Sequence, residues 1–160
     1  MLLAMSEGDA ARVLADCPPR LCGALLQGIA AERPTMAATI LGLLRPVTAG
    51  HAFAYLRLET AASLIVAMVQ SEAQRILEST DERTAAGVIM ELPAPTSTLL
   101  LRSMNSRQHA ARVLTHVRPA TAAELLSSDP EFAGAVLRHL SEPVRKQVSR
   151  YLLAERTRPR

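Results

Sequence analysis

Four carboxylates around one predicted turn have the chemistry to bind a divalent cation. Glu72, Glu78, Asp81 and Glu82 form the one acidic concentration in the sequence. Mg²⁺ prefers hard oxygen ligands in octahedral geometry, which carboxylates supply. The other interpretation is a solvated turn in which Asp81 caps the helix that follows, because Asp is a favoured N-cap residue. The sequence leaves both interpretations open.

Positive charge is concentrated at the C-terminal end. Residues 138–160 carry a net charge of +5, whereas the preceding residues carry −2. On a predicted helix that begins near residue 142, Arg145, Lys146 and Arg150 lie on neighbouring positions. Such a face could contact an acidic protein, an anionic membrane surface or the phosphates of a nucleic acid. These three residues are therefore the candidate partner-binding side chains.

A second interpretation treats residues 141–160 as a basic terminal capping helix and tail. Val148 and Tyr151 lie on the side of this helix opposite the cations, where they would pack on the preceding helices. The whole chain has only two Phe, two Tyr and no Trp. Because base stacking uses aromatic side chains, this composition argues against nucleic-acid binding.

The cysteines and histidines do not suggest catalysis. Cys17 and Cys22 fall at apolar positions of the pattern described below, where free Cys packs as a small hydrophobic residue. His109 and His116 are two helical turns apart, about 10 Å along a helix, which is too far for one metal ion. The sequence contains no GxSxG, GxxxxGK[ST], GxGxxG or HExxH motif. We therefore expect a protein that is not an enzyme.

The composition indicates the elements that must position these side chains. The 160 residues include 27 Ala and 24 Leu, about a third of the chain. Ala and Leu favour helices, whereas strands prefer β-branched and aromatic residues. The longest uncharged stretch runs from Thr60 to Ser71 and is too short to cross a bilayer, which takes about 20 residues of helix. We expect an all-α, cytoplasmic protein that does not span a membrane.

A repeat with a period of twelve runs through most of the chain. A small residue recurs as its anchor in most units, and the anchor positions are Ala11, Gly23, Ala38, Gly50, Ala62, Gln74, Ala86, Thr98, Ala111 and Ala123. An aliphatic or aromatic residue follows three positions after each anchor, at Leu14, Leu26, Leu41, Phe53, Ile65, Leu77, Ile89, Leu101, Leu114 and Leu126. Positions three apart share one helical face, so each unit is predicted to be a helix of about two turns.

Proline and capping residues predict where the helices begin. Proline is tolerated at the first helical position and occurs four positions before an anchor at Pro19, Pro34, Pro46 and Pro119. Capping residues are predicted at Ser71, Asp81 and Ser106. The interval from Gly23 to Ala38 is longer than the others, and we interpret residues 30–33 as a longer connection.

Helices this short are not stable alone and must be held by their neighbours. Stacked short helices bury a shared core, and Ala or Gly at the anchors allows close approach of their backbones. The sequence therefore predicts about ten to twelve short helices in a single domain over residues 1–160. Its expected shape is a right-handed superhelix, an armadillo-like α-solenoid.

The units DAARVL, TAASLI, RTAAGVIMEL, HAARVL and TAAELL resemble the repeated helices of the N domain of MgtE-type magnesium transporters. That domain is also similar to a domain of the motor protein FliG. The resemblance covers about residues 7–127 and extends to the last two predicted helices. It implies a regulatory cytoplasmic domain, close to the inner face of the membrane, whose partner is a CBS or membrane domain and whose ion is Mg²⁺. This family carries many carboxylates, and this chain has Arg in place of many of them, for example Arg45, Arg57 and Arg102.

The leading hypothesis is a helical-repeat domain that regulates a transporter through protein contacts and Mg²⁺. One alternative is a FliG-like structural adaptor that assembles through its terminal helices. Another is a nucleic-acid or membrane-surface binder that uses the basic C-terminal tail.

Overall fold

The computed structural model describes residues 2–157, and these residues form helices and connecting turns with no strand. The prediction of an all-α protein is confirmed. The chain divides into two compact units, Met1–Glu91 and Leu92–Arg160, which we call the N-terminal unit and the C-terminal unit. The single domain over residues 1–160 and the right-handed superhelix stay predictions.

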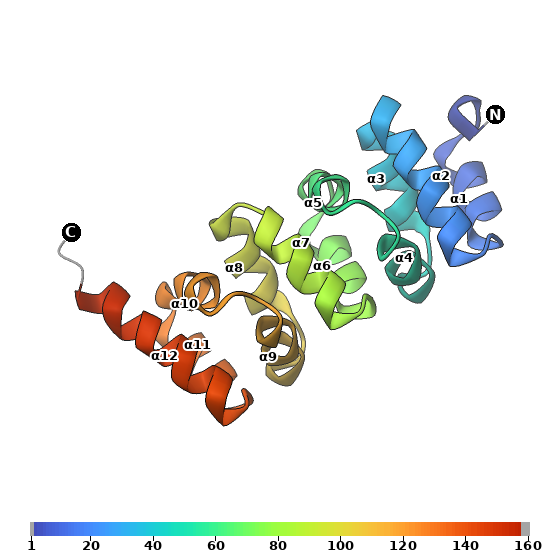
Figure 1. The fold of residues 1–160 in the computed structure, drawn as a ribbon. Helices are drawn as coiled ribbons and strands as arrows, with labels where there is room; N and C mark the ends of the chain where they lie inside the picture. The colour runs from blue at the N-terminus through green and yellow to red at the C-terminus, as the bar shows by residue number, and fades with distance from the viewer. Residues whose placement is uncertain (1, 158–160) are drawn as a thin grey trace. The chain divides into compact units, whose positions relative to one another are not determined.

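The N-terminal unit contains a short 3-10 helix followed by seven α-helices (Figure 1). They are η1 (Leu2–Ala4), α1 (Glu7–Ala15), α2 (Pro19–Glu32), α3 (Pro34–Leu43), α4 (Pro46–Phe53), α5 (Leu58–Ala67), α6 (Gln70–Ser79) and α7 (Glu82–Glu91). The C-terminal unit contains α8 (Ala94–Ser103), α9 (Arg107–Thr115), α10 (Pro119–Ser127), α11 (Pro130–Leu137) and α12 (Glu142–Thr157).

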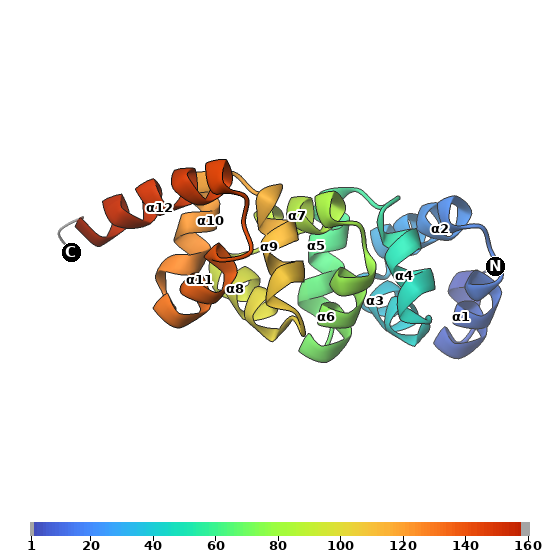
Figure 2. The same ribbon diagram turned by 90° about the horizontal axis from the view of Figure 1, so that it is seen from below.

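Most helices pack on the second helix along the chain, and α2 also packs extensively on its neighbour α3. In the N-terminal unit, α1 contacts α3, α2 contacts α4, α3 contacts α5, α4 contacts α6 and α5 contacts α7. The C-terminal unit repeats the arrangement, with α8 on α10, α9 on α11 and α10 on α12. Figure 2 shows α12 lying beside α10. The repeat of short helices is therefore confirmed in both units.

The core follows the repeat. Every residue predicted three positions after an anchor is buried, and none is more than 2 % exposed. Burying one Leu or Ile side chain stabilises the fold by about 1.5–3 kcal/mol. Most of these helices are close in length to α3, which has 10 residues, and such a helix is not stable alone in water. Shared burial therefore holds the helices in place.

Two anchors show why small residues occur where helices meet. A Cβ atom added to Gly23 would lie 2.7 Å from the carbonyl oxygen of Ala52 in α4 and 2.7 Å from Cβ of Tyr55. One added to Gly50 would overlap the carbonyl oxygen of Ser79, the last residue of α6. The backbones therefore approach closely at these glycines, as predicted, and a side chain there would push the helices apart.

The predicted helix starts are confirmed in most cases. Helices α2, α3, α4 and α10 begin at the four predicted prolines. The Ser106 side chain accepts a hydrogen bond from the His109 backbone N–H at 3.3 Å and so caps α9. The capping role predicted for Ser71 is wrong, because α6 begins at Gln70. The carbonyl of Val69 already accepts the N–H of Ala73, which places Ser71 inside the helix.

The interpretation of residues 30–33 as a long connection is also wrong. Helix α2 continues to Glu32, and α3 begins two positions later at Pro34. Ala30 and Ala31 favour helix, whereas the residue before a proline is pushed out of the helical region. The extra length of this interval therefore extends α2.

Candidate functional site

Asp81 acts as a helix cap in the acidic turn between α6 and α7. Its Oδ1 accepts a hydrogen bond from the Thr84 backbone N–H at 2.9 Å. Partial burial acts to raise the pKa of this carboxyl, but hydrogen bonds from Thr84 and Arg83 outweigh it and hold the pKa below its ordinary value. The Asp81 carboxylate thus caps the start of α7.

The other three predicted carboxylates lie along α6 and at the start of α7. Glu72 is in the first turn of α6 and lies close to Gly42 of α3. A Cβ atom added to Gly42 would lie 2.9 Å from Oε2 of Glu72. Glu78 is half-buried near the end of α6, and Glu82 begins α7. Within residues 2–157, no three His, Cys, Asp or Glu side chains form a group that could hold a metal ion. The donor set does not fit a Mg²⁺ site built from this turn alone, and Mg²⁺ binding stays a prediction.

The predicted partner-binding cations are exposed on α12. Arg145, Lys146 and Arg150 all point to solvent. The ammonium of Lys146 lies 2.6 Å from a carboxylate oxygen of Glu142, one turn earlier on the same helix. An exposed pair of this kind contributes little to stability, so these cations are available to meet an acidic surface. Residues 158–160 of the predicted basic tail, Arg158 and Arg160 among them, lie outside the described residues.

Helix α12 covers α10, as expected of a terminal helix. Val148 is fully buried in this contact, and Val144 and Leu152 are half-buried. The placement of Tyr151 on the packed side was wrong, because 49 % of this residue is exposed. Tyr151 lies one position before Leu152 and so falls at the rim of the contact, where it lines a shallow groove with Pro119.

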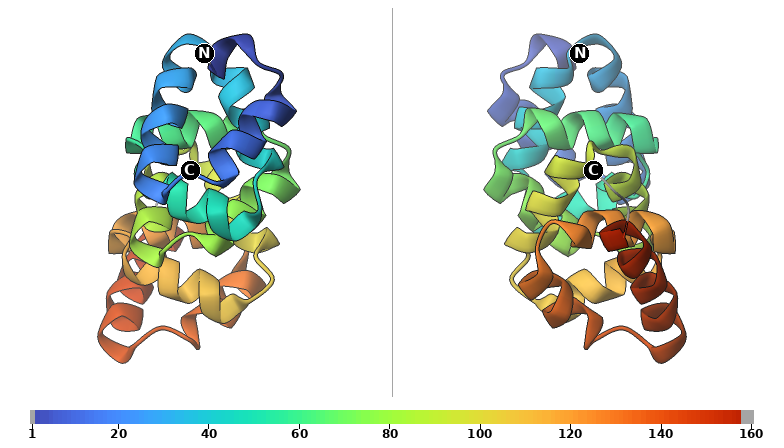
Figure 3. Two further views of the ribbon diagram at one scale, coloured as in Figure 1. Left: turned by 90° about the vertical axis from the view of Figure 1, so that its right-hand side faces the viewer. Right: turned by 90° about the vertical axis from the view of Figure 1, so that its left-hand side faces the viewer.

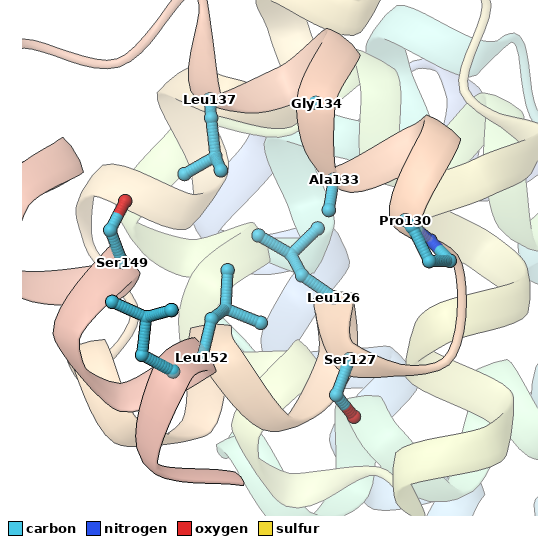
Figure 4. A pocket seen from close by; sticks show the side chains of 9 residues that line it. Leu126, Ser127, Pro130, Ala133, Gly134, Leu137, Ser149 and Leu152 are labelled. Atoms are coloured by element: carbon cyan, nitrogen blue, oxygen red, sulfur yellow. The ribbon is translucent and has the colours of Figure 1, made fainter. Parts of the chain in front are cut away.

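A second groove lies on the other side of α12, inside the C-terminal unit (Figure 4). It has a volume of about 330 Å³ and is lined by Leu126, Ser127, Pro130, Ala133, Gly134, Leu137, Ser149, Leu152 and Leu153. We call it the α11 groove. In Figure 4 the side chains of Leu126, Leu137 and Leu152 point toward one common space between three helices. The lining is mostly apolar, which suits another apolar surface better than a polar small molecule.

Sequence reasoning missed the α11 groove. A signal for it was present, because α2, α4 and α11 each begin with proline, any two residues, a small residue and glycine. In α11 these residues are Pro130, Ala133 and Gly134. Their recurrence marks places where a second helix approaches closely, but only the structure shows which of these places is covered.

The two thiols differ in burial. Cys22 is fully buried, and burial, together with the charge of nearby Cys17, raises its pKa to about 11. Thiolates are the reactive form, so Cys22 is a poor nucleophile. Cys17 is half-buried, and its Sγ lies 3.3 Å from the carbonyl oxygen of Val13, which accepts its weak hydrogen bond. The prediction of a buried thiol is thus confirmed for Cys22 and only in part for Cys17.

His109, one of the two histidines considered as metal ligands, is half-buried on α9. Its Nδ1 lies 3.3 Å from a guanidinium nitrogen of Arg112, one turn later on α9. Its Nε2 is buried and has no hydrogen-bond partner among the described residues. No carboxylate, Ser or Cys completes a catalytic arrangement with it in the contacts that the described part of the chain shows.

Taken with the fold, this surface defines the class of protein. Short helices that each pack on the second helix along, with exposed grooves beside them, are typical of an all-α helical-repeat protein. No helix in the described part of the chain combines the length and the apolar character needed to cross a membrane. The family model described as the MgtE intracellular N domain matches residues 29–115, more than half of the chain. The chain therefore belongs to the MgtE intracellular N domain family. Neither the curated proteins nor the solved structures gave a match.

Proposed function

We propose that this chain is a regulatory domain of a magnesium transport system and acts by binding another protein in the cytoplasm. The observation that carries the proposal is the family match over residues 29–115. It is supported by a repeat of short helices that leaves apolar grooves and cationic side chains on the surface. The partner proposed is a CBS or membrane domain of the transporter.

The proposed mechanism is a shift between conformations of the helical stack. Short helices that contact only their neighbours can change curvature with small adjustments at each contact. A partner that binds one curvature more tightly moves the population toward it, by no more than the difference between its two affinities. We also propose that the chain catalyses no reaction, which agrees with the buried, weakly acidic thiol of Cys22.

The role of Mg²⁺ can be tested at Asp81. Because Asp81 caps α7, Asp81→Ala should lower the free energy of unfolding by about 1 kcal/mol, equally with and without millimolar Mg²⁺. Asp81→Asn should retain most of the stability, since Asn also caps helices. An increase in melting temperature with Mg²⁺ that disappears in both Asp81→Ala and Glu82→Ala would instead assign a metal site to this turn.

The same carboxyl predicts a pH dependence. Its folded-state pKa lies below its ordinary value of 3.8, so its stabilising effect is present above pH 3.8 and is lost as the pH falls through the folded-state pKa. The difference in stability between the wild type and Asp81→Ala should therefore shrink below pH 3.8. Urea unfolding followed by circular dichroism at several pH values measures it, and a difference that grows at low pH would contradict the cap.

The regulatory function is tested in the cell that carries the gene. Deleting the coding segment for residues 1–160 should raise cellular Mg²⁺ content when external Mg²⁺ is high, because a regulatory brake is lost. Content at limiting Mg²⁺ should not change. Atomic absorption measures both, with the same deletion complemented by the intact segment as the control. Equal Mg²⁺ contents in all strains at both concentrations would contradict the proposed function.

A further inference from the structure

Three helices in this protein begin with the same short pattern. Proline occupies the first position, a small residue the fourth and glycine the fifth, in Pro19–Gly23 of α2, Pro46–Gly50 of α4 and Pro130–Gly134 of α11. The helical period places the first, fourth and fifth positions on one face of the helix. Each helix therefore presents a flat, small-residue face at its start.

In two of these helices the end of another helix covers the face. The last residue of α6, Ser79, has its carbonyl oxygen so close to Gly50 that an added Cβ would overlap it. Ala52 in the last turn of α4 and Tyr55 in the turn after it cover Gly23 in the same way. In both cases the covering element is the second helix along the chain. The pattern is thus used twice as a seat for a helix.

The third face is open. No atom of the described residues lies within 4 Å of a Cβ built on Gly134, apart from its own helix and its chain neighbours. The face lines the α11 groove, and beside it Leu153 of α12 is 64 % exposed. In the right-hand view of Figure 3, α11 and α12 of the C-terminal unit face the viewer. Helix α11 contacts α9, and within the described residues no second helix along the chain is available to pack on it.

We propose that the α11 groove seats an amphipathic helix of a partner protein, with aliphatic residues on its inner face and acidic residues beside them. The position continues an existing interface, because a helix seated on α11 would repeat the packing of α9 on α11. The proposal deepens the proposed function and rests on it, since it names the surface through which a regulatory domain would contact its partner.

Cations lie where α11 ends and on α12, whereas Asp129, which is paired with Arg102, and the exposed Glu131 flank Pro130 at the start of α11. Arg138 follows Leu137 directly at the end of α11, and Arg145 lies one turn before Ser149 on α12; both are exposed. Arg138 and Arg145 would attract carboxylates on the incoming helix and repel basic side chains. Residues 138–160 carry +5 in total, which adds a longer-range attraction.

Helix α6 shows what a seated helix looks like in this protein. It buries Ala73, Ile76 and Leu77 and carries Glu72 and Glu78 on its flanks. A peptide of residues 69–81, stabilised as a helix because its length is marginal in water, is therefore a suitable probe. The stabilised peptide replaces the unidentified partner helix in the experiment.

The experiment measures fluorescence anisotropy of the labelled peptide as the full chain is added. Gly134→Leu fills the open face without meeting another described atom at its Cβ, and should weaken binding at least roughly tenfold. Gly28→Leu is the matched control, because a Cβ at Gly28 of α2 also meets no described atom within 4 Å. Circular dichroism verifies that both variants fold. Peptides with Ile76→Asp, or with Glu72→Gln and Glu78→Gln together, should bind more weakly than the parent.

Loss of binding in Gly134→Leu but not in Gly28→Leu supports the proposal. No binding to the wild type, or equal loss in both variants, overturns it. Sedimentation of the chain alone and flotation with phosphatidylglycerol vesicles test two other occupants. Self-association or vesicle binding that Gly134→Leu abolishes would assign the groove to a second copy or to a lipid surface and overturn the partner helix. Because peptide binding is measured on the isolated chain, its failure is separate from a failure of the Mg²⁺ content experiment.

Discussion

Helices α4 and α11 have the same length and the same pattern but different surroundings. Each begins with proline and carries Ala-Gly at its fourth and fifth positions. Helix α4 packs on α2 on one side and α6 on the other, and its Phe53 is fully buried. Helix α11 packs on α9 and α10, and its Gly134 remains open. The same sequence pattern thus contacts another helix in α4 and is left uncovered in α11.

The two helices are also held at their starts by different means. No side chain caps α4, whose N-cap residue is Arg45. Asp129 caps α11 by accepting the Phe132 N–H at 3.0 Å, and its other oxygen lies 3.1 Å from Nε of Arg102. The Arg107 guanidinium also lies 5.0 Å from the centre of the Phe132 ring. Helix α11, whose face at Gly134 is open, thus has a side-chain cap that α4, packed on α2 and α6, lacks.

The largest expected effect comes from filling the covered face. In Gly50→Ala the new methyl group meets the Ser79 carbonyl, and the resulting overpacking should lower the free energy of unfolding by about 1–3 kcal/mol. Chemical denaturation measures the change. A neutral or stabilising result would show that α4 and α6 are not in the close contact described.

The next effect concerns the cap of α11. Asp129→Ala removes both the hydrogen bond to Phe132 and the ion pair with Arg102, and should cost about 1–2 kcal/mol. Arg45→Ala, at the same position before α4, is the matched control and should change stability by less than about 0.5 kcal/mol. Thermal unfolding of both variants compares them, and equal losses would contradict the different roles of the two starts.

A smaller effect of opposite sign is expected at the open face. Gly134→Ala adds a methyl group where there is space and improves helix propensity, so it should stabilise the C-terminal unit by about 0.5–1 kcal/mol. The pair Gly50→Ala and Gly134→Ala therefore separates a covered glycine from an open one by the sign of the change. Destabilisation by Gly134→Ala would mean that this face is already covered.

The smallest perturbation is chemical labelling of the thiols. Cys22 is fully buried and its pKa is raised to about 11, so it should resist alkylation at mildly alkaline pH in the native protein. The half-buried Cys17 should be modified first, as read by mass spectrometry of peptides. Rapid modification of both residues before unfolding would contradict the packing of α2.

The sequence predicted the repeat well because burial follows helical periodicity. Residues such as Leu14 and Leu114 must be inside when positions three apart share a face. The sequence specifies the helix boundaries less well than the buried positions, since Gln70 and Ser71 are both compatible with the first turn of α6. The α11 groove could not be predicted, because Gly50 and Gly134 look alike in sequence and differ only in the helix that covers one of them.

Helix α11 presents an open face for a partner helix, whereas α6 already covers the matching face of α4. Amide hydrogen exchange of the full chain, with and without the stabilised peptide of residues 69–81, tests it most directly. We expect added protection in residues 130–137 and 149–153, and no change in residues 46–53, because α6 already packs there. Unchanged exchange in α11, or equal protection in α4 and α11, would contradict it.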